Sequence, residues 1–148
     1  MESPLIILEG VTITPLKRVH HPKGDIYHAL KCTDDSFEEF GEAYFTTIHQ
    51  NDVKGWKQHK TMLMNLVVPV GVVGFHFFNE RISKGAFVEV APHNYVRVTV
   101  QPGIWMAFQG LSKDLNLILN LASTPHDPAE AINVELGAFP FSKAVNTV

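Results

Sequence analysis

The chain has 148 residues, of which 45% are hydrophobic and 18% charged, and this composition is typical of one folded domain. The formal net charge is −3 and no block of Lys and Arg occurs, so the sequence lacks the basic surface that nucleic-acid binding requires. The single Cys32 cannot form an intramolecular disulfide of the kind that stabilises small secreted domains. Prolines and glycines interrupt the longest apolar stretch before it reaches the length of a bilayer span. We therefore expect one soluble, cytoplasmic domain over residues 1–148, with no membrane segment.

Most of the predicted elements are short β-strands separated by turns. In chain order, we expect strands in PLIILEGVTITPL, GEAYFTTIHQ, VKGWKQHKTMLMNLVVPV, VVGFHFFNER, AFVEVAP, YVRVTVQPG and LNLILNLAS. In AFVEVAP and YVRVTVQPG every second residue is valine, as on a strand with one buried face. Short strands at this spacing predict an all-β sandwich or barrel.

Two short helices are also predicted. TDDSFEEFGE has Thr33 or Asp34 as a candidate N-cap and is long enough for one or two turns. TPHDPAEAIN has Asp127 as N-cap, Pro128 at the first helical position and Glu130 at the third.

The heptapeptide KGWKQHK, residues 54–60, places an amine and an imidazole two residues apart. On a strand, Lys57 and His59 point to the same side. Trp56 lies on the opposite side and a buried apolar run begins at Met62, which favours an interior position for the pair. The neighbouring lysines leave the alternative that this side faces solvent.

His76 lies in GFHFF, between apolar residues, and is the histidine of most interest among the eight. A buried neutral imidazole needs a hydrogen-bond partner, so His76 is either a satisfied core residue or part of a pocket. The histidines follow no zinc-like spacing.

Three segments in this order resemble the short members of the dTDP-4-dehydrorhamnose 3,5-epimerase family, a branch of the cupins. They are KGWKQHKTMLMNLVVPVGVVGFHFFNE, FVEVAPHNYVRVTVQPGIWMAFQGLS and LILNLASTPHDPAE. The resemblance extends over most of the chain, from Lys23 to Pro128. It implies a double-stranded β-helix, the cupin jelly roll, usually assembled as a homodimer.

The resemblance also suggests which residues form the site. The Arg-Gly-x-His stretch of the epimerases falls on Lys54-Gly55-Trp56-Lys57, so Lys54 takes the place of a phosphate-binding arginine and Lys57 that of the catalytic histidine. His59 matches a second histidine of the related sugar 3,4-ketoisomerases. An earlier Arg-Gly, which also contacts phosphate, matches Lys23-Gly24. The remaining substrate-binding candidates are Asn65, His76, Tyr95 and Trp105.

Several positions depart from the family pattern. A later histidine is replaced by Met106, and the tyrosine that serves as general acid falls near Asn120. The four ligand positions of metal-binding cupins read Lys57, His59, Met64 or Asn65, and Met106. One possible ligand out of four predicts no metal, and no other cofactor is expected.

The family resemblance implies an epimerase or keto-isomerase of a nucleotide-linked sugar, of the dTDP-4-keto-6-deoxyhexose type, in deoxysugar or surface-polysaccharide biosynthesis. Such an enzyme removes a proton next to a carbonyl. Either Lys57 is the base, with a strongly lowered pKa, or His59 is the base and charged Lys57 stabilises the enolate. We favour the second assignment because it requires no large pKa shift. The alternative is a non-catalytic cupin that binds a nucleotide sugar or another small anionic ligand.

Overall fold

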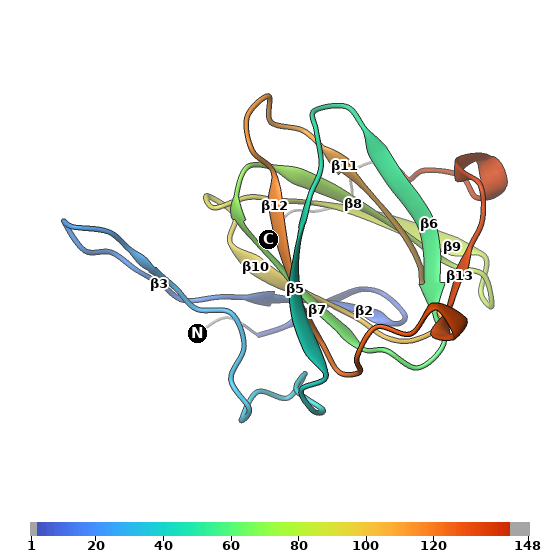
Figure 1. The fold of residues 1–148 in the computed structure, drawn as a ribbon, viewed down its shortest axis with the longest axis horizontal. Helices are drawn as coiled ribbons and strands as arrows, with labels where there is room; N and C mark the ends of the chain where they lie inside the picture. Colours follow the sequence, from blue (N-terminus) through green and yellow to red (C-terminus); the bar gives the residue numbers. More distant parts are fainter. Residues whose placement is uncertain (1–2, 143–148) are drawn as a thin grey trace.

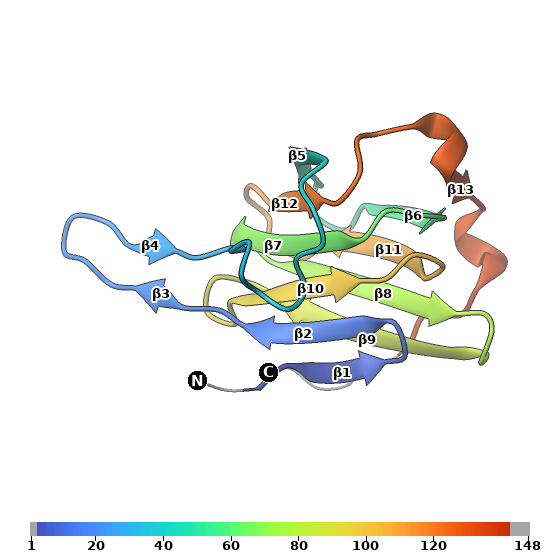
Figure 2. The same ribbon diagram turned by 90° about the horizontal axis from the view of Figure 1, so that it is seen from below.

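The computed structural model describes residues 3–142, which form two β-sheets packed face to face, with a narrow hairpin extending from one end (Figure 1, Figure 2). The larger sheet has the strand order β1-β2-β10-β7-β12-β5, the second sheet has the order β13-β6-β11-β8-β9, and β3 and β4 form the hairpin. Neighbouring strands are antiparallel throughout the three sheets. This arrangement confirms the all-β cupin jelly roll. The elements are β1 (Leu5–Leu8), β2 (Val11–Pro15), β3 (Arg18–Val19), β4 (Ile26–Tyr27), β5 (Glu42–Thr47), β6 (Val53–His59), β7 (Met64–Val70), β8 (Val73–Asn79), β9 (Lys84–Val90), β10 (Val96–Val100), β11 (Trp105–Gly110), β12 (Leu117–Ala122), η1 (Pro128–Glu130), β13 (Ala131–Asn133) and η2 (Leu136–Ala138).

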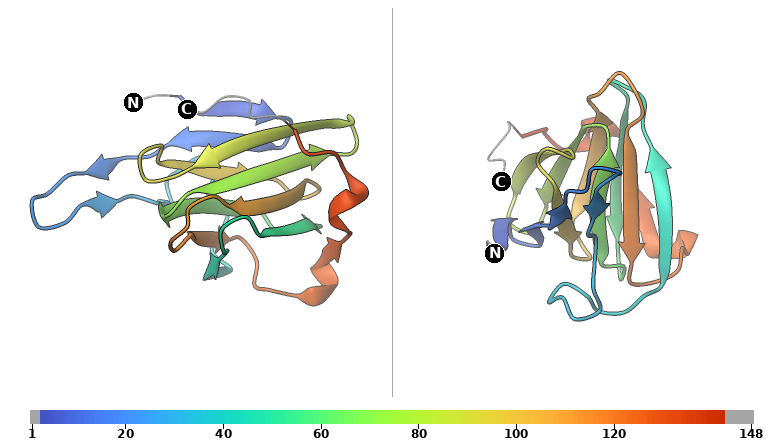
Figure 3. Two further views of the ribbon diagram at one scale, coloured as in Figure 1. Left: turned by 90° about the horizontal axis from the view of Figure 1, so that it is seen from above. Right: turned by 90° about the vertical axis from the view of Figure 1, so that its left-hand side faces the viewer.

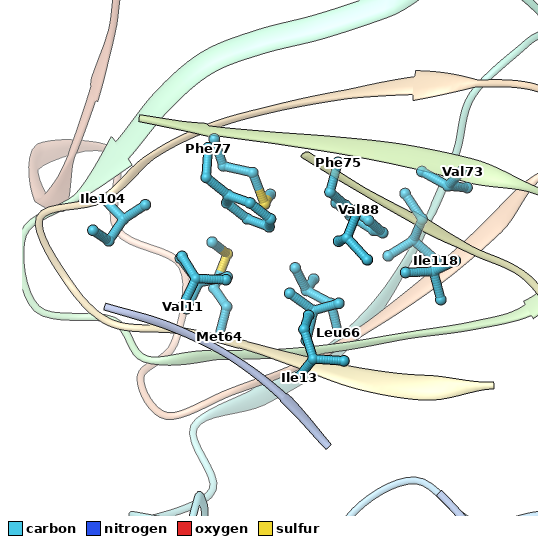
Figure 4. Packing of buried hydrophobic residues seen from close by; sticks show 14 of the residues in the cluster. Val11, Ile13, Met64, Leu66, Val73, Phe75, Phe77, Val88, Ile104 and Ile118 are labelled. Atoms are coloured by element: carbon cyan, nitrogen blue, oxygen red, sulfur yellow. The ribbon is translucent and has the colours of Figure 1, made fainter. Parts of the chain in front are cut away.

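The main hydrophobic core lies between the two sheets (Figure 4). Because side chains alternate across a strand, every second residue of β2, β7, β8, β9 and β10 points into this core. On β9 the alternation is the expected one, since Val88 and Val90 are buried in the core. The residues labelled in Figure 4 are Val11, Ile13, Met64, Leu66, Val73, Phe75, Phe77, Val88, Ile104 and Ile118.

Two long predicted strands are each divided in the structure. The opening segment forms β1 and β2 with a turn at Gly10, whose φ is +99° and where a Cβ would lie 2.6 Å from Ile104 Cδ1. Only glycine fits this turn without strain. The segment from Val53 to Val70 forms β6 and β7, which belong to different sheets. Four further strands, β3, β4, β11 and β13, are not among those predicted from the sequence.

The first predicted helix is wrong. Residues 33–41 form turns and loop that lie on the outer face of the six-stranded sheet. The Asn65 amide donates to the Ser36 carbonyl at 3.0 Å, and the Arg97 guanidinium contacts the Asp34 carboxylate at 3.3 Å. These contacts to the sheet hold the segment outside a helical conformation.

The second predicted helix is present as one short turn, η1, and its start signal is confirmed. Asp127 caps it by accepting from the Ala129 amide at 3.0 Å. The chain then continues as β13 beside β6, and residues 134–142 run across the outside of the five-stranded sheet (Figure 3). None of the helices formed by residues 3–142 has the length and apolar character needed to cross a membrane.

Candidate active site

A cavity of about 300 Å³ lies between the two sheets, where β5 and β12 face β6 and β11. Part of its wall is the end of the hydrophobic core, because Met64, Leu66, Phe75 and Ile118 belong to both (Figure 4). The polar part of the wall is formed by Tyr44, Thr46, Lys54, Lys57, His59, Asn120 and Asn133. Polar groups thus converge on an otherwise apolar space, which is the usual composition of a small-molecule site.

Strand β6 supplies three cations or potential cations to the cavity. Lys57 and His59 both line it, as their two-residue spacing predicted. Lys54 also lines it although it lies three residues before Lys57, because β6 carries one extra residue opposite β11. Gly55 makes this bulge possible: its φ is +141°, and a Cβ there would lie 2.5 Å from Ala107 Cβ.

His59 is held by a carboxylate that the sequence analysis did not identify as functional. Its Nδ1 lies 2.7 Å from Glu130 Oε1, and the two side chains are 6% and 9% exposed. Glu130 Oε2 accepts from the backbone amides of Thr61 and Met62, each at 2.9 Å. With Nδ1 donating to Glu130, the other ring nitrogen of His59 is the one that can accept a proton.

The hydrogen bonds to Glu130 also determine its charge. Burial by itself raises the pKa of this carboxyl group, but the hydrogen bonds from His59 and from the amides of Thr61 and Met62 lower it, and the net result is a pKa of about 2. Glu130 is therefore a carboxylate at neutral pH. No local pattern predicts the contact, because 71 residues separate Glu130 from His59, and the position was interpreted only as the third residue of a helix.

The opposite wall of the cavity carries a tyrosine that the sequence analysis also did not single out. Tyr44 on β5 and Asn120 on β12 are directly paired across the two strands. The Asn120 amide donates to the Tyr44 hydroxyl oxygen at 2.9 Å. In the sequence, Tyr44 and Thr46 share one face of GEAYFTTIHQ, but the strand pairing that joins them to Asn120 is visible only in the structure.

Two of the predicted substrate-binding residues lie away from this cavity. Asn65 follows Met64, which faces the core, so strand alternation turns its side chain to the outer face of the sheet, where it contacts Ser36 and Thr99. Lys23 is exposed in the turn of the β3–β4 hairpin.

His76 and Trp105 point to the outer face of the five-stranded sheet. His76 alternates with Phe75, which lines the cavity, so the imidazole points away from the cavity and packs between Phe87 and Phe141, with ring centroids at 4.7 and 4.5 Å. Trp105 packs against Phe139 and donates through Nε1 to Glu80. Both are structural residues of this outer layer, and neither offers a surface to a ligand in the cavity.

Tyr95, the last predicted substrate-binding residue, is buried at the base of the hairpin. Its ring makes an edge-to-face contact with Tyr27 at 5.2 Å, and its carbonyl accepts from the Leu16 amide. Tyr95 therefore anchors the hairpin to the sheet.

The side chains at the metal-ligand positions of cupins do converge on the cavity. Lys57, His59, Met64 and Met106 all line it, which places one imidazole, one amine and two thioethers together. Within residues 3–142, no three His, Cys, Asp or Glu side chains are grouped so that they could hold a metal ion.

Comparison with known proteins finds no matching family model and no matching curated protein. Among solved structures, a dTDP-sugar isomerase from Desulfovibrio desulfuricans is 28% identical, with a TM-score of 0.88 over 93% of each chain. A sugar 3,4-ketoisomerase from Thermoanaerobacterium thermosaccharolyticum, solved with TDP, is 20% identical, with a TM-score of 0.72 over 84% of this chain and 88% of that one. The dTDP-4-dehydrorhamnose 3,5-epimerase of Sulfolobus tokodaii is 12% identical, with a TM-score of 0.82 over 94% and 85%.

The last two similarities establish the fold, and the first adds sequence identity along nearly the whole chain. Together with the jelly-roll topology and the order of the sequence motifs, they support the resemblance of the chain to the RmlC-like cupins.

Proposed function

We propose that this protein is an epimerase or keto-isomerase of a nucleotide-linked 4-keto-6-deoxy sugar, in deoxysugar or surface-polysaccharide biosynthesis. The observation that carries the proposal is the pairing of Glu130 with His59, which lines the cavity with the Lys57 amine on the same wall. The similarity in structure and sequence to a dTDP-sugar isomerase supports the same substrate class.

The reaction begins with removal of a proton from the carbon beside the ketone. His59 is the base, and the Glu130 carboxylate accepts its Nδ1–H and stabilises the imidazolium that forms. The Lys57 ammonium stabilises the negative charge that develops on the ketone oxygen. This division of roles leaves Lys57 charged and uses the imidazole where a base is needed near neutral pH.

The cavity holds the sugar, and the nucleotide lies outside it. A volume of about 300 Å³ is at the lower end for ligand pockets, enough for a hexose but not for a nucleoside diphosphate as well. Lys54 lines the cavity and is exposed, so its ammonium is placed to meet the diphosphate at the entrance.

The protein is proposed to act as a homodimer. β1 is an edge strand of the larger sheet, and Ile6 on it is 69% exposed, while Ile26 on the projecting hairpin is 58% exposed. Apolar edges of this kind are usually covered. The hairpin projects from one end of the molecule (Figure 1), so a dimer is the arrangement that can bring Lys23 to the diphosphate of a second subunit. Light scattering that gives the mass of a single chain at micromolar concentration contradicts the dimer.

The cytoplasm is the proposed location, because Cys32 is an exposed free thiol of the kind that reducing compartments preserve.

The alternative function is a cupin that binds a nucleotide sugar or another small anionic ligand without turnover. The replacements at Lys57 and near Asn120 favour it, since the epimerases that the sequence resembles carry the catalytic histidine and the acidic tyrosine there.

One experiment separates the two functions. The protein is incubated in deuterated water with 4-keto-6-deoxy sugars linked to dTDP, UDP, GDP or CDP, and the sugars are followed by NMR. Deuterium at a carbon beside the ketone, with formation of a new sugar, is the expected result. Saturable binding of a sugar nucleotide without deuterium uptake establishes the binding protein instead.

A further inference from the structure

The proposed reaction needs an acid as well as a base. After His59 has taken a proton from the substrate carbon, the enolate must receive a proton to become product. Asn120, near which the acidic tyrosine of the epimerases falls, cannot supply one, because an amide is not a proton donor of the required strength.

A phenol nevertheless lines the cavity, and Asn120 holds it in place. Tyr44 lies on β5, directly opposite Asn120 on β12, and accepts a hydrogen bond from the Asn120 amide at 2.9 Å. Because Asn120 donates to the phenol oxygen, the phenol keeps its own O–H for another partner. The donated N–H also lies where negative charge develops when the phenol releases its proton.

The two sheets place Tyr44 and His59 on opposite walls. β5 belongs to the six-stranded sheet and β6 to the five-stranded sheet, and the cavity lies between them. A sugar ring in this space therefore has the imidazole on one side and the phenol on the other. Thr46 is on the same wall as Tyr44, but an alkyl hydroxyl is too weak an acid to compete with a phenol.

We propose that Tyr44 is the proton donor of the reaction, held in position by Asn120. This assignment rests on the proposed function. His59 takes the proton from the C–H bond, and the electron pair moves into the enolate. The Tyr44 O–H bond then breaks as a new C–H bond forms. The phenolate recovers a proton from water and His59 releases its proton to the solvent, so both groups return to their starting state. Strand β5 thus supplies the acid that β12 lacks.

The test compares Tyr44→Phe with wild type in deuterated water, using the sugar nucleotide on which the wild type acts. Two quantities are measured by NMR: deuterium uptake into the substrate and formation of the product sugar. In the variant, His59 still exchanges the substrate proton, so uptake persists, while product formation falls by about 10²–10⁴-fold. Tyr27→Phe, in the hairpin, is the matched control and leaves both quantities unchanged.

Each other outcome has a defined meaning. Product formation at the wild-type rate in Tyr44→Phe overturns the assignment and leaves the proposed function standing. Equal loss of uptake and product also overturns it, because a proton donor acts after the base. Absence of uptake and product in the wild type overturns the proposed function, and the assignment of Tyr44 with it.

A second variant covers the case in which Tyr44→Phe does not fold. Replacement of Tyr44 by 3,5-difluorotyrosine keeps the hydroxyl and the ring but makes the phenol more acidic. If Tyr44 is the donor, the alkaline pH at which product formation declines moves to a lower value, whereas the same replacement at Tyr27 leaves the profile unchanged. An unchanged profile in the Tyr44 variant overturns the assignment.

Discussion

The two faces of the five-stranded sheet are formed by alternate residues of the same strands, and their chemistry is opposite. On β6, Trp56 points outward and is fully buried, whereas Lys57 and His59 point inward to the cavity. The outer face packs ring against ring: the centroids of Trp56 and Phe139 lie 5.7 Å apart, and those of Trp105 and Phe139 lie 5.2 Å apart. The inner face keeps an open space instead and buries the hydrogen-bonded His59–Glu130 pair beside it.

This difference indicates that the two faces of the sheet have different functions. Burial of large aromatic rings removes apolar surface from water and stabilises the fold. A buried pair of this kind contributes little net stability, because removing its polar groups from water offsets most of the gain from their hydrogen bond. The outer face therefore stabilises the sheet and the inner face provides the reactive groups. Substitutions on the two faces should separate stability from activity.

The largest effect is expected from His59→Asn on the inner face. Loss of the base lowers deuterium uptake and product formation by up to about 10⁴-fold. The variant also leaves a buried Glu130 with fewer partners, which costs about 1–3 kcal/mol of stability. Rates of uptake and urea unfolding curves measure the two effects.

The matched control for this variant is His49→Asn, since His49 is exposed on the loop between β5 and β6. It should leave both measurements unchanged. Uptake at the wild-type rate in folded His59→Asn contradicts the role of His59 as base and transfers that role to Lys57.

Trp56→Ala tests the outer face. The substitution removes the stacking on Phe141, at 5.3 Å, and the hydrogen bond from the indole to the Leu136 carbonyl, at 3.0 Å. Because the residue is fully buried, we expect a loss of about 3–5 kcal/mol in the free energy of unfolding. The activity of the molecules that remain folded should be unchanged. Phe45→Ala, at a 65% exposed aromatic position on β5, is the control that should cost little.

Lys57→Met replaces the charge on the inner face with an apolar side chain of similar length. If Lys57 stabilises the enolate, product formation falls by about 10²–10³-fold. None of the ion pairs formed by the described residues includes Lys57, so stability should stay equal or rise. Thermal melting and steady-state kinetics check both parts. A large drop in melting temperature with activity retained would show that Lys57 is a structural residue.

Much of the fold could be predicted from the sequence because local patterns determine it. Alternation of apolar residues identified most strands, and the spacing of Lys57 and His59 identified their shared side. The resemblance to a known family supplied the jelly roll. The structure places Asn65 and His76 away from the cavity, because strand alternation turns both side chains to the outer faces of the sheets.

The hydrogen-bond partners of the reactive side chains could not be predicted from local sequence patterns. Glu130 reaches His59 across 71 residues, and Asn120 reaches Tyr44 across 76. Such contacts depend on which strands become neighbours, and the sequence near either residue does not specify this. The sequence therefore predicts which single side chains can react, but it does not predict the hydrogen-bonded pairs that orient them.

The smallest expected effect is a change in the pH dependence of stability, caused by protonation of His76 on the outer face. Burial lowers the pKa of this imidazole, although the neighbouring Gln109 side chain raises it in part. In the unfolded chain the pKa returns to about 6.5, so below that pH the unfolded state binds more protons than the folded state. Stability is therefore complete above about pH 6.5 and declines as the pH falls toward the lower folded value. His76→Leu, packed between Phe87 and Phe141, should reduce this decline, so that unfolding midpoints in urea differ less between about pH 5 and about pH 8 than in the wild type. The same slope in both proteins would assign the pH dependence to other groups and leave the outer face independent of pH.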